Sequence, residues 1–522
     1  MVRAARGRLD RLDGGGIGFG AGDERGQRVG TEMDMMGGGK SGYERLGGAK
    51  LSLVDVIAQS VGFMGPVFST AFIIPLIVGI ISATGKGAGV AAPLSVLLAG
   101  IGVFALGWIV AQYAKRIHAA GSLYDYVSNG LGRTIGAATG WLYYGGTIVL
   151  TTGLGVLIGG YVHDTLQMEY NVEPLPIWAW NVVWALLLFG FLYFGVQLST
   201  RSQLTLALVS ALAVLAFSIY VISQAENDVG RAFNPNEAPD GMTGVLFGIL
   251  YGVLIFVGFE TAANLAEETR NPKRAIPRAV LTSVVVVAIF YLVTSYAQVA
   301  GFGFSVQTFA SAAAAPLFAL ASPASAGGFG STTLVRVMEV VVLLDIMAVG
   351  IGAAVASTRG LFAMGRDRRL PRPLAAVSKR YETPVGAIVF LLVIQAAFIV
   401  ATEFWDDLFA LPDLPHYFSI FAWASTFGGF ALVVVYLLMA VGALVGLRDH
   451  PRYAGVVIAA IVGIALTGGA IYGSFAEVPS PTILAPIYAL VWAGIGLLFM
   501  LVIRGREPAR VALADLSTGE EG

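Results

Sequence analysis

The chain has 522 residues, of which 56% are hydrophobic and only 12% are charged, whereas about 25% are charged in an ordinary soluble domain. Such a composition indicates an integral membrane protein, and the net charge of −1 provides no basic surface to favour a nucleic acid partner. The chain has no cysteine, which excludes disulfides, thiolate metal sites and cysteine nucleophiles.

The first 50 residues differ in composition from the rest of the chain. They are rich in Gly, Arg and Asp and show no apolar periodicity, so we expect a disordered cytoplasmic tail at 1–50. This segment also lacks the apolar core of a signal peptide.

Apolar runs long enough to cross about 30 Å of hydrocarbon, about 20 residues each, recur along the rest of the chain. The twelve expected spans are 53–81, 93–113, 135–162, 177–198, 204–223, 242–266, 280–300, 334–364, 384–401, 417–447, 454–472 and 483–503. Between the seventh and eighth spans, the Ala- and Ser-rich segment 301–333 predicts short helices over the outer mouth. They would form either a lid or a surface segment with no special role.

Basic residues are unevenly distributed among the connecting loops. The loops after the even-numbered spans and the C-terminal tail carry most of them, including Lys115, Arg116, Arg133, Arg201, Arg270, Lys273, Arg274, Arg278, Arg366, Arg368, Arg369, Arg372, Lys379 and Arg380. The alternate loops carry acidic residues instead. The positive-inside rule therefore predicts a multi-pass protein of the cell membrane with both termini in the cytoplasm.

The first span is interrupted by two glycines and a proline, in the stretch Ser60-Val61-Gly62-Phe63-Met64-Gly65-Pro66. Pro66 has no N–H for the carbonyl four residues back, and Gly62 and Gly65 hold a helix weakly. We expect two half-helices, with Pro66 at the first position of the second. Hydrocarbon cannot satisfy the freed backbone groups, so such an interruption lines a cavity or binds a ligand. The alternative is a simple kink or packing contact, since Gly and Pro are common in membrane helices.

A second interruption is expected in the sixth span, at Phe256-Val257-Gly258-Phe259-Glu260. A carboxylate in a membrane span is costly and usually faces a cavity or a partner. Interrupted spans that stand five apart suit two five-helix repeats of opposite topology, and paired discontinuous helices point to a transporter site where the repeats meet. The alternative is a single broken helix and a structural Glu260.

The expected domain organisation follows from these repeats. It consists of the tail 1–50, the repeats 51–224 and 242–447, two further helices at 452–503 and a cytoplasmic tail at 504–522.

Several stretches resemble the signature of amino acid permeases of the amino acid–polyamine–organocation superfamily. They are Ala120-Gly121-Ser122-Leu123-Tyr124, the interruption in span six with Ala266-Glu267-Glu268-Thr269-Arg270-Asn271-Pro272 after it, and Arg359-Gly360-Leu361-Phe362-Ala363-Met364-Gly365-Arg366-Asp367. The resemblance implies an all-α integral membrane protein with twelve transmembrane helices. It also implies a leucine-transporter-like 5+5 inverted repeat with broken helices 1 and 6, and alternating access.

The two interruptions together suggest a receptor for an amino acid. N–H groups freed near Gly62–Gly65 would lie at the positive end of a half-helix and suit a carboxylate, and carbonyls freed near Phe256–Phe259 would suit an ammonium group. The expected substrate-binding residues are Gly62, Phe63, Met64, Gly65, Tyr144, Thr147, Phe256, Val257, Gly258 and Phe259. Phe259 is either an aromatic gate or plain packing, and Tyr143 is expected to pack or to face lipid.

Four polar residues are candidates for coupling and gating. Glu260 could exchange a proton or be fixed by hydrogen bonds. Ser357 and Thr358 could complete a sodium site with carbonyls of span one, or bond back to their own helix. Asp345 would favour a cationic amino acid or polyamine if it faces the pocket, but would have no bearing on the substrate if it pairs with Arg336 or faces water. No cofactor is expected beyond a proton or sodium ion.

The function that best fits these features is secondary transport of an amino acid, driven by a proton or sodium gradient or by exchange. A polyamine or other organocation transporter and a transporter-like sensor or channel are the alternatives. An enzyme is disfavoured, because the sequence has no metal-ligand spacing, no nucleotide-binding glycine loop and no cluster of His and acidic residues. The expected partners are the lipid bilayer and a small solute.

Overall fold

The computed structural model describes residues 46, 50–79, 87–173, 175–312, 316–405, 409–411, 414–476, 478 and 480–503. All of them belong to one compact unit, 45–522. The tails expected at 1–50 and 504–522 lie outside the described residues, except for Leu46 and Lys50.

The described chain is helical, apart from two isolated β-bridges. Ten helical segments are long and apolar enough to cross a membrane, and α8 (Ile177–Tyr193) and α11 (Met242–Leu254) are shorter apolar helices. The ten are α2 with α3 (Leu53–Met64, Pro66–Phe72), α5 (Ala92–Ala114), α7 (Arg133–Tyr170), α9 (Val196–Gln224), α12 (Pro272–Gly301), α15 (Thr332–Arg366), α16 (Val385–Phe404), α17 (His416–Gly446), α18 (Tyr453–Gly473) and α19 (Leu484–Val502). Length alone thus supports ten spans rather than the twelve expected.

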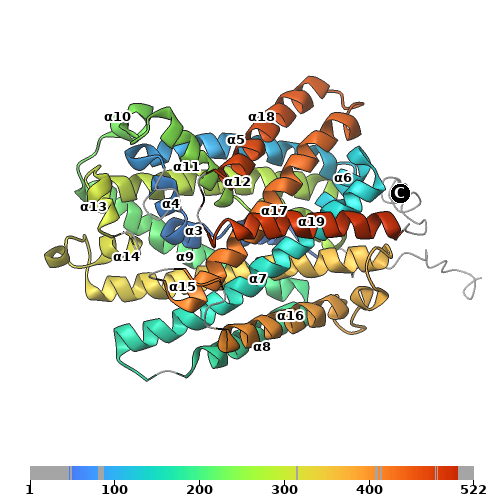
Figure 1. The fold of residues 1–522 in the computed structure, drawn as a ribbon, viewed down its shortest axis with the longest axis horizontal. Coiled ribbons are helices and arrows are strands. Elements are labelled where there is room, and N and C mark those ends of the chain that lie inside the picture. The colour runs from blue at the N-terminus through green and yellow to red at the C-terminus, as the bar shows by residue number, and fades with distance from the viewer. Residues whose placement is uncertain are drawn as a thin grey trace, which may run out of the picture. The chain divides into compact units, whose positions relative to one another are not determined.

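Short helices lie at both ends of this helical unit. The segment 301–333 forms α13 (Val306–Ala310), α14 (Pro316–Ala321) and η4 (Ala324–Ala326), in agreement with the expected short helices. Figure 1 shows α13, α14 and α10 (Val229–Ala232) at one end, here called the α13 end. At the opposite end, the α6 end, lies α6 (Leu123–Leu131).

Two helices start from recognisable local signals. At the beginning of α2, Ser52 and Asp55 form a capping box, in which the Ser52 N–H donates to Asp55 Oδ2 (2.8 Å) and the Asp55 N–H donates to Ser52 Oγ (3.4 Å). Helix α9 begins after Gly195, which has φ +132°, and therefore earlier than the span expected at 204–223. As a result, Gln203 is part of this helix.

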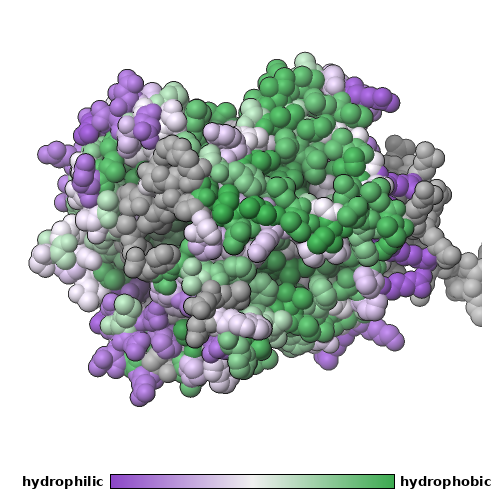
Figure 2. Space-filling view, viewed as in Figure 1, coloured by the Kyte–Doolittle hydropathy of each residue, from purple (hydrophilic) through white to green (hydrophobic). Residues whose placement is uncertain are grey.

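The interior of the unit is formed by α7 and α15, whose apolar windows are 78% buried, compared with 28% for α19. Helix α7 packs against α15 and α17, α15 packs against α9, and α12 packs against α2 and α5. Helices α18 and α19 pack on the outside of this group. In Figure 2, hydrophobic residues cover the middle of the visible face and hydrophilic residues gather toward its ends, as expected for a bundle embedded in a bilayer.

Candidate functional site: two facing helix interruptions

The first interruption is a single residue, Gly65, in the left-handed conformation (φ +57°, ψ 70°) between α2 and α3. Pro66 occupies the start of α3, as predicted. The Gly65 N–H still donates to the Val61 carbonyl (3.3 Å), and the Gly65 carbonyl accepts from the Ser69 N–H (2.8 Å). The helix therefore winds without interruption through Gly62, and the chain changes direction only after Met64.

The freed N–H groups are not those of residues 62–65, so the sequence prediction was wrong on this point. The N–H groups without a helical acceptor belong to the first turn after an interruption, which here means Val67 and Phe68. Both donate to Asp345 Oδ2, over 2.9 Å from Val67 and 2.7 Å from Phe68. A carboxylate therefore lies at the start of α3, but it is supplied by the protein.

Asp345 lies on α15 and is fully buried. Its other carboxylate oxygen, Oδ1, has no hydrogen-bond partner among the described residues. The expected alternative, a pair with Arg336, does not occur, because Arg336 bonds the carboxylate and the carbonyl of Glu169 (3.5 and 3.0 Å). Asp345 therefore faces the first interruption.

The second interruption follows α11 and consists of tight turns. Hydrogen bonds run from residue i+3 to residue i, for example from the Phe259 N–H to the Phe256 carbonyl (3.1 Å) and from the Thr261 N–H to the Gly258 carbonyl (3.0 Å). Gly258 has φ +106°, which a residue with a side chain rarely adopts. The chain then continues as the 3₁₀ helix η3 (Thr261–Glu268).

Several carbonyls of this interruption are already bonded within the protein. The Ile255 carbonyl accepts from the Tyr291 hydroxyl (2.8 Å), and the Gly258 carbonyl accepts from Thr261 Oγ1 (2.7 Å). The Phe259 carbonyl accepts from Ser60 Oγ (2.8 Å). The backbone receptor for an ammonium group expected at Phe256–Phe259 is thus partly saturated by side-chain hydroxyls.

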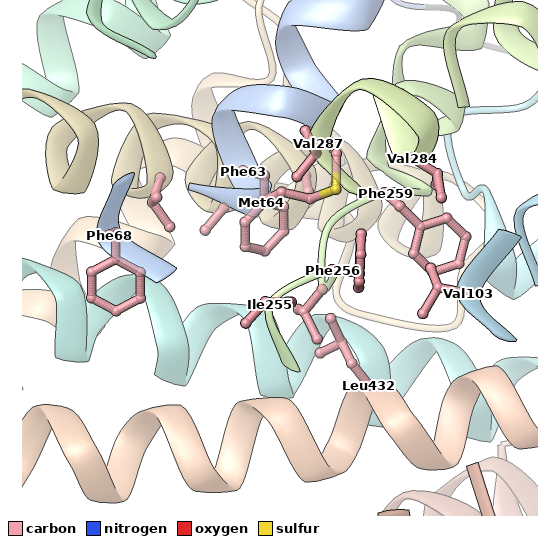
Figure 3. Packing of buried hydrophobic residues seen from close by; sticks show 14 of the residues in the cluster. Phe63, Met64, Phe68, Val103, Ile255, Phe256, Phe259, Val284, Val287 and Leu432 are labelled. Atoms are coloured by element: carbon pink, nitrogen blue, oxygen red, sulfur yellow. The ribbon is translucent and has the colours of Figure 1, made fainter. Parts of the chain in front are cut away.

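The two interruptions lie against each other. A Cβ atom on Gly258 would come within 2.7 Å of Phe63 Cγ, so only glycine allows this approach. The hydroxyl of Tyr291, on α12, bonds the carbonyls of both interrupted spans, at Met64 (3.1 Å) and Ile255 (2.8 Å). Figure 3 shows Phe63 and Met64 close to Phe256 and Phe259. Tyr291 and Ser60 were missed as site residues, although each is a hydroxyl in an apolar run.

The predicted wall residues on α7, Tyr144 and Thr147, use their hydroxyls in hydrogen bonds within the protein. The Tyr144 hydroxyl donates to the Gly121 carbonyl (2.7 Å), toward the α6 end, and Thr147 Oγ1 donates to the Tyr144 carbonyl of its own helix (3.2 Å). Tyr143 was expected to pack or to face lipid; it is fully buried, in agreement with packing, and its hydroxyl also bonds Glu260.

Glu260 is fully buried and held by two tyrosines. Its Oε1 accepts from Tyr143 and its Oε2 accepts from Tyr436, each over 2.7 Å. The Phe259 ring packs 5.1 Å from the ring of Tyr436, between centroids. The arrangement matches the expected alternative of a carboxylate fixed by hydrogen bonds.

Ser357 and Thr358 bond back to their own helix, over 2.7 Å to the Ala353 carbonyl and 2.8 Å to the Ala354 carbonyl. The Arg359 guanidinium also donates to Thr358 Oγ1 (3.4 Å), and a fixed positive charge beside this oxygen opposes binding of sodium. Within the described ranges, no group of three or more His, Asp or Glu residues is arranged to hold a metal ion.

The motifs that carry the family resemblance meet at the α6 end. Arg359 and Glu268 form a buried ion pair (3.1 Å), and Arg366 pairs with Glu267 (2.9 Å). Glu267 also accepts from the Ala120 N–H (2.9 Å). The sequence reasoning used these residues only for recognition, because their pairing joins segments more than 90 positions apart.

Two further features lie at this end. Burial, together with the charge of Asp367, raises the pKa of the Asp125 carboxyl on α6 well above its usual range. A cavity of about 410 Å³ is lined by the start of α9, including Arg201, by Glu268 and by polar residues outside the helices: Lys50, Arg380, Tyr381 and Glu382.

Comparison with known proteins gives consistent matches. The family model described as "Amino acid permease" matches residues 61–478. The methylthioribose transporter of Bacillus subtilis is 25% identical over 321 residues, covering 59% of this chain and 66% of that protein. The branched-chain amino acid permease BcaP of Bacillus subtilis is 24% identical over 341 residues, covering 60% and 68%. The vacuolar cationic amino acid transporter 4 of Arabidopsis thaliana is 25% identical over 368 residues, covering 67% and 58%.

The chain spans 66% or less of the length of the first three curated relatives that it matches. Among solved structures, variants of the Eremococcus coleocola manganese transporter have a TM-score of 0.52 and 12% identity, covering 90% of this chain and 98% of that chain. At this identity the similarity shows a common fold.

Proposed function

Because this chain belongs to the amino acid permease family, whose members are transporters and not enzymes, we propose that it is a secondary active transporter of a small amine-bearing solute. That solute is an amino acid or an organic amine. The observation that carries the proposal is the meeting of two interrupted spans, with Gly258 against Phe63 and Tyr291 bonded to both. Non-helical backbone deep in a membrane protein is retained where it serves a binding site.

The proposed architecture is twelve spans with a 5+5 inverted repeat, 51–224 and 242–447, in which α8 and α11 also cross the membrane. Helix contacts support this proposal because they occur in equivalent pairs. The contact of α7 with α17 corresponds to that of α15 with α9, and the contact of α12 with α2 corresponds to that of α11 with α5. An exchange of the two repeats converts each contact into its counterpart.

In this proposal, the solute binds at the interruptions and is exposed alternately to the two sides of the cell membrane. The predicted tails, 1–50 and 504–522, would both lie in the cytoplasm, and helices 452–503 would lie outside the repeats. The absence of a nucleotide-binding motif from the sequence favours a proton gradient, a sodium gradient or exchange as the energy source.

The proposed coupling residue is Glu260, whose two tyrosine partners come from α7 and α17. Loss of its proton would change the hydrogen bonds between these helices and span six. Replacement by glutamine keeps the size of the side chain but removes the titration, so Glu260→Gln is expected to abolish proton-driven accumulation and to leave solute exchange in place.

The proposal is tested with the full-length protein reconstituted in liposomes. Radiolabelled amino acids and amines are supplied while a proton gradient, a sodium gradient or only internal solute is present. We expect accumulation or exchange of at least one solute above the level of protein-free liposomes. If monodisperse, folded protein moves none of them under any condition, the transporter proposal is wrong.

A further inference from the structure

The position of Asp345 is informative because it resembles that of a ligand. The start of α3 offers two N–H groups, and these groups favour a negative charge. Asp345 Oδ2 accepts from both, at 2.9 and 2.7 Å. In a transporter built around this interruption, a substrate carboxylate would require the same two donors.

The second carboxylate oxygen of Asp345 takes no part in the bonds to these donors. Asp345 is fully buried, and its Oδ1 has no hydrogen-bond partner among the described residues. A buried carboxylate oxygen that has no hydrogen-bond partner is energetically costly unless an opposite charge approaches it. Oδ1 therefore points to a cationic ligand.

Backbone carbonyls at the end of α2 supply further negative charge. Pro66 cannot donate to the Gly62 carbonyl, and the Val67 N–H donates to Asp345 instead of to the Phe63 carbonyl. The C-terminal end of a helix favours a cation. A Cβ atom built on Gly65 would lie 3.5 Å from Asp345 Oδ2, so the carboxylate and this helix end are close together.

A group of three aromatic rings lies next to Asp345. Phe68, whose N–H binds Asp345, has its ring 5.5 Å from that of Phe72 and 5.6 Å from that of Phe421, between centroids. Ring faces attract ammonium groups, and their edges pack against the carbon skeleton of an amine.

We propose that Asp345 takes the place of a substrate carboxylate, so that the site accepts an organic amine that has no carboxylate of its own. The ammonium group binds to Asp345 Oδ1 and to the carbonyls of Gly62 and Phe63. An α-amino acid is rejected because its carboxylate would compete with Asp345 for the same two N–H donors and would be repelled by it. The inference rests on the proposed transport function and specifies its substrate class.

The first experiment uses the wild-type, full-length protein and needs no substitution. Purified protein is titrated with matched pairs of probes that differ by one carboxylate: putrescine and ornithine, cadaverine and lysine, tyramine and tyrosine. Binding is read from thermal stabilisation in detergent, and transport from exchange in liposomes. We expect stabilisation and exchange by at least one amine, and weaker or no effect of its parent amino acid.

The second experiment replaces the charge. Asp345→Asn keeps the shape and an oxygen for the α3 donors but removes the charge that pairs with the ammonium. Loss of one partner from a buried charge pair is expected to weaken amine affinity by on the order of 30-fold or more. Glu339→Gln, which changes another carboxyl on the same helix, is the matched control and is expected to retain wild-type affinity. Gel filtration confirms that each variant is folded.

The outcomes separate this inference from the transport proposal. If amino acids stabilise the protein and are exchanged while their amines are not, the inference about Asp345 is overturned and the transporter remains. Unchanged amine affinity in a folded Asp345→Asn variant also overturns it. If an amine binds the wild-type protein but Asp345→Asn does not fold, Asp345→Ser is titrated with that amine instead. The same loss of amine affinity is expected. If no probe binds or moves, both proposals fail together.

Discussion

Gly65 determines the change of direction in the first interrupted span. Its left-handed conformation costs a residue with a side chain about 1–2 kcal/mol. A Cβ atom here would also collide with Val349 of α15, the helix that carries Asp345. The residue therefore fixes both the direction of α3 and its distance from α15.

Gly65→Ala is expected to lower the free energy of unfolding by about 1–2 kcal/mol or more and to reduce transport, because backbone strain adds to the collision with Val349. The matched control is Gly468→Ala in α18, where a Cβ would meet no atom within 4 Å. The control should be neutral or stabilising by up to about 1 kcal/mol, since alanine favours helix. Thermal unfolding in detergent measures the change in stability, and liposome uptake measures the change in transport. Equal losses of stability and transport in the two variants would contradict a special role of Gly65.

Asp125 gives a residue-level prediction of pH dependence. Burial and the nearby Asp367 raise the pKa of Asp125 in the folded state, so between its ordinary pKa and the raised value the folded protein binds more protons than the unfolded chain. Stability should therefore fall as pH rises through the folded pKa of this group. The charges of Arg366 and Glu267 act on the same carboxyl, Arg366 lowering its pKa and Glu267 raising it.

Asp125→Asn is expected to be more stable than the wild type at neutral pH and to lose part of the pH dependence. Melting temperatures of both proteins across mildly acidic to neutral pH provide the test. Parallel curves for the two proteins would show that Asp125 does not titrate as stated.

At the residue level, the sequence located the interruptions but not their chemistry. Pro66 and the two glycines were sufficient to predict where the first span changes direction. The identity of the group at the freed N–H donors could not be predicted, because Asp345 is 278 positions away from Val67. For the same reason, no sequence pattern indicated that Tyr291 would bond both interruptions.

Individual helices are held together at the α6 end by a buried charge pair. Arg359 of α15 and Glu268 at the end of η3 are 0% and 4% exposed, whereas the pair between Lys50 and Glu382 is about half exposed, at 51% and 47%. A buried pair resists the loss of one partner much more strongly than an exposed pair does, because the remaining charge is left without compensation.

Arg359→Met and Glu268→Met should each lower the free energy of unfolding by about 3–5 kcal/mol, and the double variant should recover much of that loss. Lys50→Gln, which breaks the exposed pair, should cost less than about 1 kcal/mol. Denaturant unfolding in detergent provides the comparison. Additive losses in the double variant would argue against direct coupling of Arg359 and Glu268.

At the level of elements, apolar run length predicted most helices, but it was less accurate at their ends. The start of the fifth span was expected too late because the residues just before Leu204 are polar; three of them, Ser199, Thr200 and Gln203, are nevertheless buried within α9. Gln203 lies beside Gly62 and Gly352 and donates to the Ala348 carbonyl (3.1 Å). This hydrogen bond pairs the side-chain nitrogen of Gln203, while its buried Oε1 has no hydrogen-bond partner among the described residues.

For the whole molecule, the orientation in the membrane is a prediction from charge distribution. The natural chain has no cysteine, so single cysteines can be introduced without a background. Ser325→Cys at the α13 end is expected to react with a membrane-impermeant reagent added outside intact cells. Lys379→Cys, in an exposed loop before α16, is expected to react only after the membrane is opened. The reverse labelling pattern would invert the proposed topology.

Composition and periodicity were sufficient to predict a helical membrane protein, and the quoted motifs were sufficient to suggest its family. The contacts that support the proposed repeats could not be predicted, since they depend on which distant segments meet. The chemistry of the site could be described only from atomic positions, because it depends on the directions of two N–H groups and one carboxylate.

Backbone hydrogen bonds connect the two interrupted spans at the α6 end. The N–H groups of Lys50 and Leu51 donate to the Glu268 carbonyl, and the Arg270 N–H donates to the Leu51 carbonyl, each over 2.9 Å. These hydrogen bonds join the segment before α2 to the end of η3 and the residues after it, so the two segments cannot separate at this end unless the bonds break. Lys50 and Glu268, which share one of these bonds, also line the cavity at the start of α9, so a molecule bound in that cavity would lie directly beside the joined segments.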